Sequence, residues 1–176
     1  MKLKQLAAFL GLCGLLVWTG AARSETKVEL KGVHLCCQGC VKAAGKIVEG
    51  VDGAKAACNQ KGKTVTITAK DDETAQKAVD ALAAGGFHGE SSNKDVTIKD
   101  DSGAAAGKVQ SLKVTGAHNC CGQCCKIIKA TVKKVDGVKG DTAKPKAESF
   151  EVTGDFDAAE LVKALNAAGF HVKVEK

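Results

Sequence analysis

Cysteine is the residue type in this chain whose number and spacing suit chemistry. Nine cysteines occur among 176 residues, and seven of them fall in two short clusters. The clusters read His34-Leu-Cys-Cys-Gln-Gly-Cys40 and His118-Asn-Cys-Cys-Gly-Gln-Cys-Cys125. Thiolates bind soft metal ions, and paired cysteines can instead form a disulfide or a redox couple. The spacing therefore leaves three chemistries open: metal binding, thiol–disulfide exchange and a structural disulfide.

Each cluster contains one Cys-x-x-Cys motif, formed by Cys37 with Cys40 and by Cys121 with Cys124. Two thiolates at this spacing can bind one ion from a loop that enters a helix. We expect the second cysteine in the first helical turn, where the helix dipole and free N–H groups lower the pKa of its thiol. Two ligands leave the ion accessible to an incoming thiol, whereas four would close the site. These cysteines are the predicted primary ligands, with about one ion per domain.

Further candidate ligands surround each motif. Cys36 and Cys120 come directly before the first motif cysteine, and His34 and His118 lie two residues earlier still. We predict these four as secondary ligands. The alternative is that the histidines only end a strand. The two remaining histidines, at equivalent positions of a repeat, are weaker candidates: His88 and His171.

The cysteines outside these sets have simpler interpretations. Cys58 has no counterpart in the second half of the sequence and is predicted to be a small buried filler. Adjacent cysteines, such as Cys124 and Cys125, are poor candidates for an internal bridge because the geometry of the disulfide would be strained.

The two clusters belong to a longer internal repeat. His118 follows His34 at an offset of 84 residues, and nine of the 20 aligned positions from 34 to 53 are identical. The tripeptide Gly86-Phe-His88 recurs as Gly169-Phe-His171, at an offset of 83. We therefore predict a tandem duplication. The predicted segments are a signal peptide at 1–24, a first domain at 25–92, a linker at 93–107 and a second domain at 108–176.

Both repeats show the same pattern of elements. Alternating apolar residues and β-branched runs predict strands, and apolar residues at helical spacing predict helices. The predicted strands are 28–30, 54–59, 64–68, 112–114 and 149–153, with further strands that begin at Phe87 and Phe170. The predicted helices are 41–50, 73–84, 126–135 and 158–168. Asp71 or Asp72 is the predicted N-cap of the helix at 73–84, and Asp155 or Asp157 that of the helix at 158–168. The order β-α-β-β-α-β predicts an α+β fold of two tandem ferredoxin-like sandwiches. Each would be a four-stranded antiparallel sheet with two helices on one face.

The Cys-x-x-Cys between first strand and first helix, followed by an Asp-Gly pair after that helix, resembles the heavy-metal-associated domain. That family includes copper chaperones, N-terminal modules of metal-pumping ATPases and the periplasmic mercury-binding protein. The resemblance covers both repeats and implies Cys37, Cys40, Cys121 and Cys124 as ligands. It implies a soft metal ion, with Cu(I) favoured and Hg(II), Zn(II) or Cd(II) as alternatives. A metal transporter or another thiol-bearing metal carrier is the implied partner.

Two features qualify the resemblance. The family's methionine before the first cysteine is Leu35 in one repeat and Asn119 in the other, and the family's glycine before that is His34 or His118. Leu35 can fill the core, but burying the polar side chain of Asn119 there has a cost in free energy. We therefore expect the second cysteine loop to adopt a different conformation from the first. A module that has lost its metal and only docks a partner therefore stays an alternative. Phe87 and Phe170 occupy the place where the family often has an aromatic residue or a lysine over the metal loop, so the resemblance implies that they shield it.

The first residues have the pattern of a secretory signal peptide. Lys2 and Lys4 precede an apolar run from 6 to 18, and small residues follow. A helix needs about 20 apolar residues to span a bilayer, so this run is too short. Cleavage would remove Cys13 and leave a mature protein with no membrane span, in the periplasm or secreted.

Charge and motifs exclude other function classes. The formal charge of +6 includes Lys2, Lys4 and Arg23 of the predicted signal peptide, and 23 basic minus 20 acidic residues leave +3 after cleavage. Because this charge is small, spread along the chain and accompanied by few aromatics, we expect no nucleic-acid partner. Neither a Ser/His/Asp order nor a phosphate-binding glycine loop stands out, so we expect that the protein is not an enzyme. An envelope thiol–disulfide oxidoreductase remains the alternative from another class. It is disfavoured because a thioredoxin-like enzyme would need a longer βαβ framework and a cis-proline near the motif, and Pro145 is the only proline available.

Overall fold

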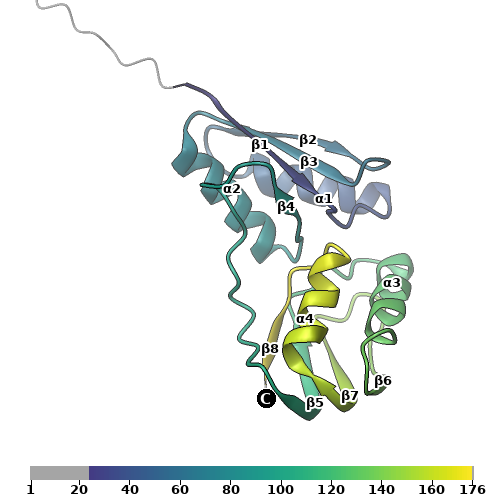
Figure 1. Cartoon of the computed structure of the whole chain (residues 1–176). Coiled ribbons are helices and arrows are strands. Elements are labelled where there is room, and N and C mark those ends of the chain that lie inside the picture. Colours follow the sequence, from purple (N-terminus) through teal and green to yellow (C-terminus); the bar gives the residue numbers. More distant parts are fainter. Residues whose placement is uncertain (1–23, 176) are drawn as a thin grey trace, which may run out of the picture.

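The computed structural model describes residues 24–175, which form two halves of similar construction (Figure 1). The N-terminal half comprises β1 (Thr26–Lys31), α1 (Gln38–Glu49), β2 (Ala54–Asn59), β3 (Thr64–Ala69), α2 (Asp72–Ala84) and β4 (Glu90–Ser91). The C-terminal half comprises β5 (Lys108–Thr115), α3 (Gly122–Val132), β6 (Val138–Asp141), β7 (Ser149–Asp157), α4 (Ala158–Ala167) and β8 (Lys173–Glu175). The predicted signal peptide, with Cys13, lies outside the described residues apart from Ser24.

Each half forms one four-stranded antiparallel sheet, as predicted. The strand orders are β2-β3-β1-β4 and β6-β7-β5-β8, so corresponding strands hold corresponding places. In the first sheet Val28 of β1 lies opposite Ile67 of β3. In the second sheet Leu112 of β5 lies opposite Val152 of β7. The α+β class and the predicted order of elements are confirmed.

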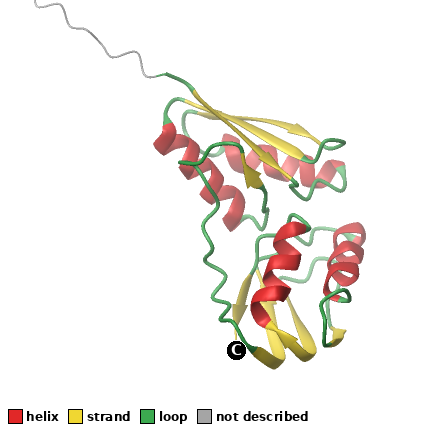
Figure 2. Cartoon of the chain, in the orientation of Figure 1, coloured by secondary structure: helices red, strands yellow, loops and turns green. Residues whose placement is uncertain are grey.

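Burial shows why these strands form a layer under the helices. Along β3 and β7 side chains alternate between buried and more exposed, which is the pattern of a sheet with one covered face. Figure 2 shows the helices of each half gathered against its sheet. Asp71 accepts a hydrogen bond from the backbone N–H of Thr74, and Asp157 accepts from Ala159 and Glu160. These two aspartates are therefore the N-caps of α2 and α4.

The last strand of each half begins later than predicted. Phe87 and Phe170, the predicted starts, lie outside β4 and β8 and instead form an antiparallel bridge with each other. Strand pairing within each half resumes only at Glu90 and Lys173. The prediction was wrong here because the residues on either side of each phenylalanine hydrogen-bond to the other half of the chain.

The segment between the halves runs beside both of them without forming a helix or strand of its own (Figure 1). Val96 is buried, and the backbone of Thr97 both donates to and accepts from the side chain of Gln76 on α2. Asp101 accepts from His171 Nε2 at 2.7 Å. The segment predicted as a linker is thus attached at several points. None of the helices in the described residues is long and apolar enough to cross a membrane.

Candidate metal centre

The two cysteine clusters lie at the N-termini of α1 and α3. Cys37 is the N-cap of α1 and Cys121 is the N-cap of α3, and each adopts an extended backbone conformation. Cys40 and Cys124 follow within the first turn, and both are fully buried. Because a helix begins at each motif, the two sulfurs of that motif come together, at 3.6 Å in both halves.

The two clusters meet each other. Across the halves, Cys36 Sγ lies 3.5 Å from Cys124 Sγ, and Cys40 Sγ lies 3.7 Å from Cys124 Sγ and 3.8 Å from Cys120 Sγ. Within the halves, Cys36 Sγ is 3.6 Å from Cys40 Sγ, and Cys120 Sγ is 3.5 Å from Cys124 Sγ. The sulfurs therefore form a single contiguous group, called the thiol cluster below. Its members are Cys36, Cys37, Cys40, Cys120, Cys121 and Cys124.

Several subsets of this cluster have the compactness that a metal ion requires. In each subset all ligand atoms lie within 4.8 Å of one another. One subset, Cys36 with Cys37 and Cys121, joins the exposed edges of the two loops. All eight described cysteines are free of disulfides. Soft, closely spaced sulfurs of this kind are suited to a thiophilic metal.

Backbone contacts between the repeated Gly-Phe-His tripeptides bring the clusters together. The carbonyl of Gly86 accepts from the backbone N–H of His118 at 3.3 Å and of His171 at 3.1 Å. The carbonyl of Gly169 accepts from the backbone N–H of His34 at 3.4 Å and of His88 at 2.9 Å. Each half therefore supplies one carbonyl and two N–H groups, and the interface has approximate two-fold symmetry.

The rings of these residues cross the interface in the same symmetric way. The ring of Phe170 lies over that of His34 with centroids 4.0 Å apart, and Phe87 lies over His118 at 4.2 Å. We predicted that each phenylalanine would shield the metal loop. The structure places each one against the histidine that precedes the loop of the other half.

Glycine is required at both turns of this interface. Gly86 and Gly169 have φ values of +82° and +87°. A Cβ on Gly86 would lie 2.2 Å from the carbonyl oxygen of Gly116, and one on Gly169 would lie 2.4 Å from the backbone nitrogen of His34. Any side chain would force the halves apart at these points.

The cysteines differ in the ionisation of their thiols, and the sequence prediction assigned the effect to the wrong one. The N–H group of Cys40 lowers the pKa of Cys37, and that of Cys124 lowers the pKa of Cys121 to about 6. Burial raises the pKa of Cys40, the second motif cysteine, well above its usual range. The helix dipole favours an anion at the N-cap, whereas Cys40, later in the same first turn, is already buried inside the protein.

Burial also raises the pKa of Cys36 and Cys120, the predicted secondary ligands. Neighbouring sulfurs contribute to both shifts, because ionised thiols so close together repel each other. Without a bound cation, these two thiols therefore retain their protons at neutral pH.

His34 and His118, predicted as an equivalent pair, have different surroundings. His34 is buried, with its pKa lowered to about 4 mainly by burial, and it groups with the sulfurs of Cys36, Cys40 and Cys124. Its Nε2 has no hydrogen-bond partner among the described residues. His118 also has a buried Nε2 without such a partner, but it joins none of these groups.

His88 and His171, the weaker candidates, belong to none of the compact ligand groups that contain the sulfurs. They face each other across the interface with their Nδ1 atoms 3.4 Å apart. Burial and the neighbouring His171 lower the pKa of His88 to about 4. Their contacts make them part of the interface between the halves.

The loop before each motif is fixed in its own way. Leu35 is buried in the core, as predicted. Asn119 is buried too, but its side-chain amide nitrogen donates to the carbonyl of Lys144 at 2.7 Å, and its backbone carbonyl accepts from the N–H of Lys146 at 2.8 Å. These bonds to a nearby segment offset part of the cost of burying the polar side chain, whose Oδ1 has no hydrogen-bond partner among the described residues.

In the N-terminal half, Gln60 from the turn between β2 and β3 supports the cysteine loop. Its amide donates to the carbonyl of Cys36 at 3.2 Å. The two cysteines that remain, Cys58 and Cys125, take no part in the thiol cluster. Cys125 is buried on α3, and Cys58 is half-buried on β2 against the core.

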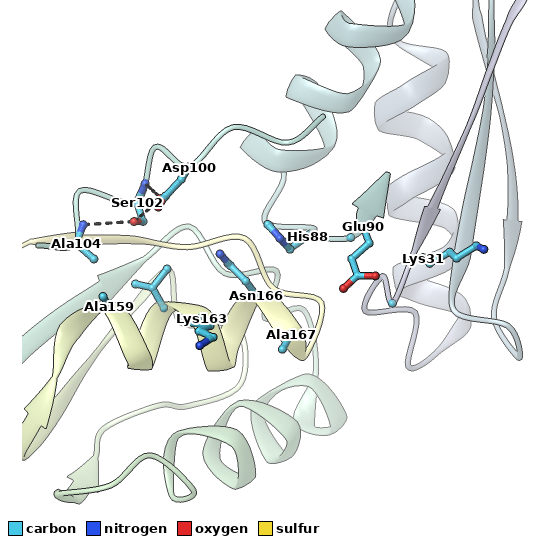
Figure 3. A pocket seen from close by; sticks show the side chains of 13 residues that line it. Lys31, His88, Glu90, Asp100, Ser102, Ala104, Ala159, Lys163, Asn166 and Ala167 are labelled. Carbon is cyan, nitrogen blue, oxygen red and sulfur yellow. Dashed lines mark hydrogen bonds between the residues drawn. The ribbon is translucent and has the colours of Figure 1, made fainter. Parts of the chain in front are cut away.

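A cavity of about 690 Å³ lies elsewhere, between β4, the connecting segment and α4 (Figure 3). His88, Asp100 and Lys163 are among the residues that line it, and no cysteine does. The thiol cluster is therefore separate from this cavity.

Comparisons with known proteins give distant likenesses only. No family model and no curated protein matches the chain. Among solved structures, a copper-binding domain from HMA7, a P-type ATPase, is 19% identical, with 39% of this chain and 95% of that chain covered and a TM-score of 0.34. The N-terminal soluble domains of Bacillus subtilis CopA are 16% identical, with 87% of this chain and 95% of that chain covered and a TM-score of 0.32. At this distance the likenesses carry no further conclusion, and the case for a metal centre rests on the sulfurs.

Proposed function

We propose that this protein is an exported carrier or store of a soft metal ion, built from two tandem domains of the heavy-metal-associated type. Cu(I) is the favoured ion, and Hg(II), Zn(II) and Cd(II) are alternatives. Cys37, Cys40, Cys121 and Cys124 are the primary ligands in this proposal. Cys36, Cys120, His34 and His118 are the secondary candidates, with His34 the better placed of the two histidines.

One observation carries the proposal: thiols from both halves converge within 3.5 to 3.8 Å of one another across the interface. Sulfurs that share a metal at about 2.3 Å lie about 3.8 Å apart, so this spacing suits a common ion. Histidine with thiolates is also a ligand set that Zn(II) accepts.

The exposed edge of the cluster suits transfer of the ion. Cys37 and Cys121 are only half-buried, their pKa values are lowered, and the residues that follow them in the helix are exposed. An incoming thiolate can reach this edge and exchange with one protein ligand at a time. Transfer of this kind forms no product, so the protein acts as a carrier and not as an enzyme. A metal transporter or a second thiol-bearing carrier is the partner that we propose.

Export is supported by the N-terminal signal pattern and is independent of the metal proposal. Fractionation of cells that express the natural chain would test it. Recovery from the periplasm or medium, with the mature N-terminus near residue 25, is the expected result. Retention of an uncleaved chain in the cytoplasm would remove export from the proposal.

One observation favours a second candidate, a thiol–disulfide oxidoreductase. The pKa of Cys121 is lowered to about 6, next to a second cysteine in the same motif, which is also how redox-active pairs are arranged. Catalysed reduction of insulin disulfides by the metal-free protein would support this alternative. A carrier shows no such turnover.

The metal proposal can be tested by competition with a chelator. Purified, reduced protein is offered Cu(I) in the presence of bathocuproine disulfonate, and retained copper is measured. We expect the natural chain to retain copper and a variant with Cys37, Cys40, Cys121 and Cys124 replaced by serine to lose it. The control replaces Cys58 and Cys125 by serine, and circular dichroism confirms that each variant folds. Equal retention by all three proteins would refute the proposal.

A further inference from the structure

The thiol cluster contains more sulfur than one or two separate ions need. Six cysteine sulfurs form a continuous chain of contacts between 3.5 and 3.8 Å. Two independent Cys-x-x-Cys sites would use only four of them. Cys36 and Cys120 would then remain as unused thiols. Yet the sulfur of Cys36 contacts that of Cys124 in the other half, and the sulfur of Cys120 contacts both Cys40 in the other half and Cys124 in its own.

We propose that the six cysteines bind a single polynuclear Cu(I)–thiolate cluster of about four ions, shared by both halves. This inference rests on the proposed function and concerns the form in which the metal is held. It differs from the expectation of about one ion per domain, because the sulfurs of both halves lie in contact with one another and form one group.

Charge is the first argument. Six thiolates around one Cu(I) would leave a large negative charge at a site where Cys40 and Cys124 are fully buried. Unbalanced charge in such surroundings is strongly unfavourable. Each further Cu(I) reduces the net negative charge by one, so six thiolates with about four ions carry a net charge of about −2.

Coordination is the second argument. A thiolate has enough lone pairs to bridge two metal ions, and a Cu(I) ion surrounded by bridging thiolates takes about three of them. Six thiolates that each bridge two ions then supply the ligands of about four ions. Cys40 and Cys124 already have the contacts that bridging requires, because each lies near sulfurs of both halves.

Enclosure is the third argument. The Gly-Phe-His tripeptides hold the halves together through four backbone hydrogen bonds that do not involve sulfur. The cluster is thereby preorganised before any metal arrives. A Cβ on Gly39, in the first turn of α1, would lie 3.4 Å from Cys37 Sγ and 4.0 Å from Cys120 Sγ, so the loop of one half packs over the helix of the other.

Loading involves proton release and no electron transfer. As about four Cu(I) ions enter, up to six thiols lose their protons to solvent, and copper remains Cu(I) throughout.

Native mass spectrometry during a Cu(I) titration of the reduced protein tests the proposal. The natural chain is expected to reach about four ions, with species of one or two ions scarce because a partial cluster leaves thiolates unbalanced. The informative variant is Cys36→Ser with Cys120→Ser, which keeps both Cys-x-x-Cys motifs. Its capacity is expected to fall to about two ions or fewer. Cys58→Ser with Cys125→Ser is the matched control and should keep the full capacity.

Saturation of the natural chain at two ions, with no effect of Cys36→Ser and Cys120→Ser, would overturn the shared cluster and leave the proposed function standing. A capacity of four ions in that variant would likewise overturn the assignment of six bridging thiols. Failure of the natural chain to retain any Cu(I) against a chelator would instead remove the proposed function, and the shared cluster with it.

Discussion

At the scale of single residues, position in the helix decides the character of each thiol. Cys37 and Cys121 cap their helices at the edge of the protein, and backbone N–H groups favour their thiolates. Cys40 lies three residues later, on the buried side of the same first turn, where burial favours the protonated thiol. The Cys-x-x-Cys pattern predicted a lowered pKa at one cysteine of each motif. Which cysteine of the motif has the lowered pKa depends on the residue at which the helix begins. Both α1 and α3 begin three to four residues earlier than the spacing of apolar residues indicated.

The pH dependence of Cys121 follows from its lowered pKa. A thiol titrates to its reactive thiolate as the pH rises through its pKa, so Cys121 should become reactive near pH 6 and lose reactivity below it. Alkylation of the metal-free, reduced protein at a series of pH values, followed by peptide mass spectrometry, measures this. Cys58, whose pKa burial raises, is the internal control and should react only at much higher pH. Coincident profiles for the two cysteines would contradict the assignment.

His34 and His118 provide a matched pair for testing ligand assignment. His34 Nε2 is buried without a partner among the described residues and lies with three sulfurs, whereas His118 lies with no such group. We expect His34→Ala to weaken Zn(II) binding by about tenfold or more, the scale seen when groups that support a metal site are removed. His118→Ala should change it by less than about threefold. Equal effects, measured by competition with a chromophoric chelator, would show that the environment of His34 is irrelevant to the metal.

At the scale of the elements, local patterns predicted most of the fold. β-branched alternation located β3 and β7, and an aspartate before each apolar stretch located the starts of α2 and α4. The ends of the two halves were predicted less well. Phe87 and Phe170 have the local sequence of a strand start, but their backbones pair with each other. Local propensity cannot reveal a partner that lies in the other half of the chain.

Gly169 tests whether this pairing holds the halves together. A Cβ there would lie 2.4 Å from the nitrogen of His34 and 2.5 Å from the carbonyl oxygen of Gly32. We expect Gly169→Ala to lower the free energy of unfolding by about 3 kcal/mol, through both the left-handed backbone and the steric clash. It should also reduce cross-linking of Cys36 to Cys124 by a short bifunctional thiol reagent.

Gly32→Ala is the matched control, because its φ of +77° is similar but a Cβ there would meet nothing within 4 Å. It should cost about 1 kcal/mol and leave the cross-link intact. Denaturant unfolding and mass spectrometry of the cross-linked peptides compare the two variants. If both variants behaved alike, the contact between the halves would not be what brings the sulfurs together.

At the scale of the whole molecule, the repeat in the sequence predicted two similar sites but not their meeting. All four histidines recur at equivalent positions, which we attributed in part to metal binding. In the structure the four lie at the interface, two against phenylalanines and two against each other. The recurrence of Gly-Phe-His near the C-terminal end of each repeat was the available signal for a symmetric contact. This recurrence was insufficient alone, because the local sequence does not indicate that one copy of the tripeptide contacts the other.

The central claim is that cysteines of both halves bind the same metal. NMR spectroscopy of the protein loaded with ¹¹³Cd tests it directly, because scalar couplings through the metal–sulfur bond identify which cysteine β-protons belong to each ion. The account predicts at least one ¹¹³Cd resonance that correlates with Cys36 or Cys40 and also with Cys120 or Cys124. Resonances that each correlate only with cysteines of one half would contradict it.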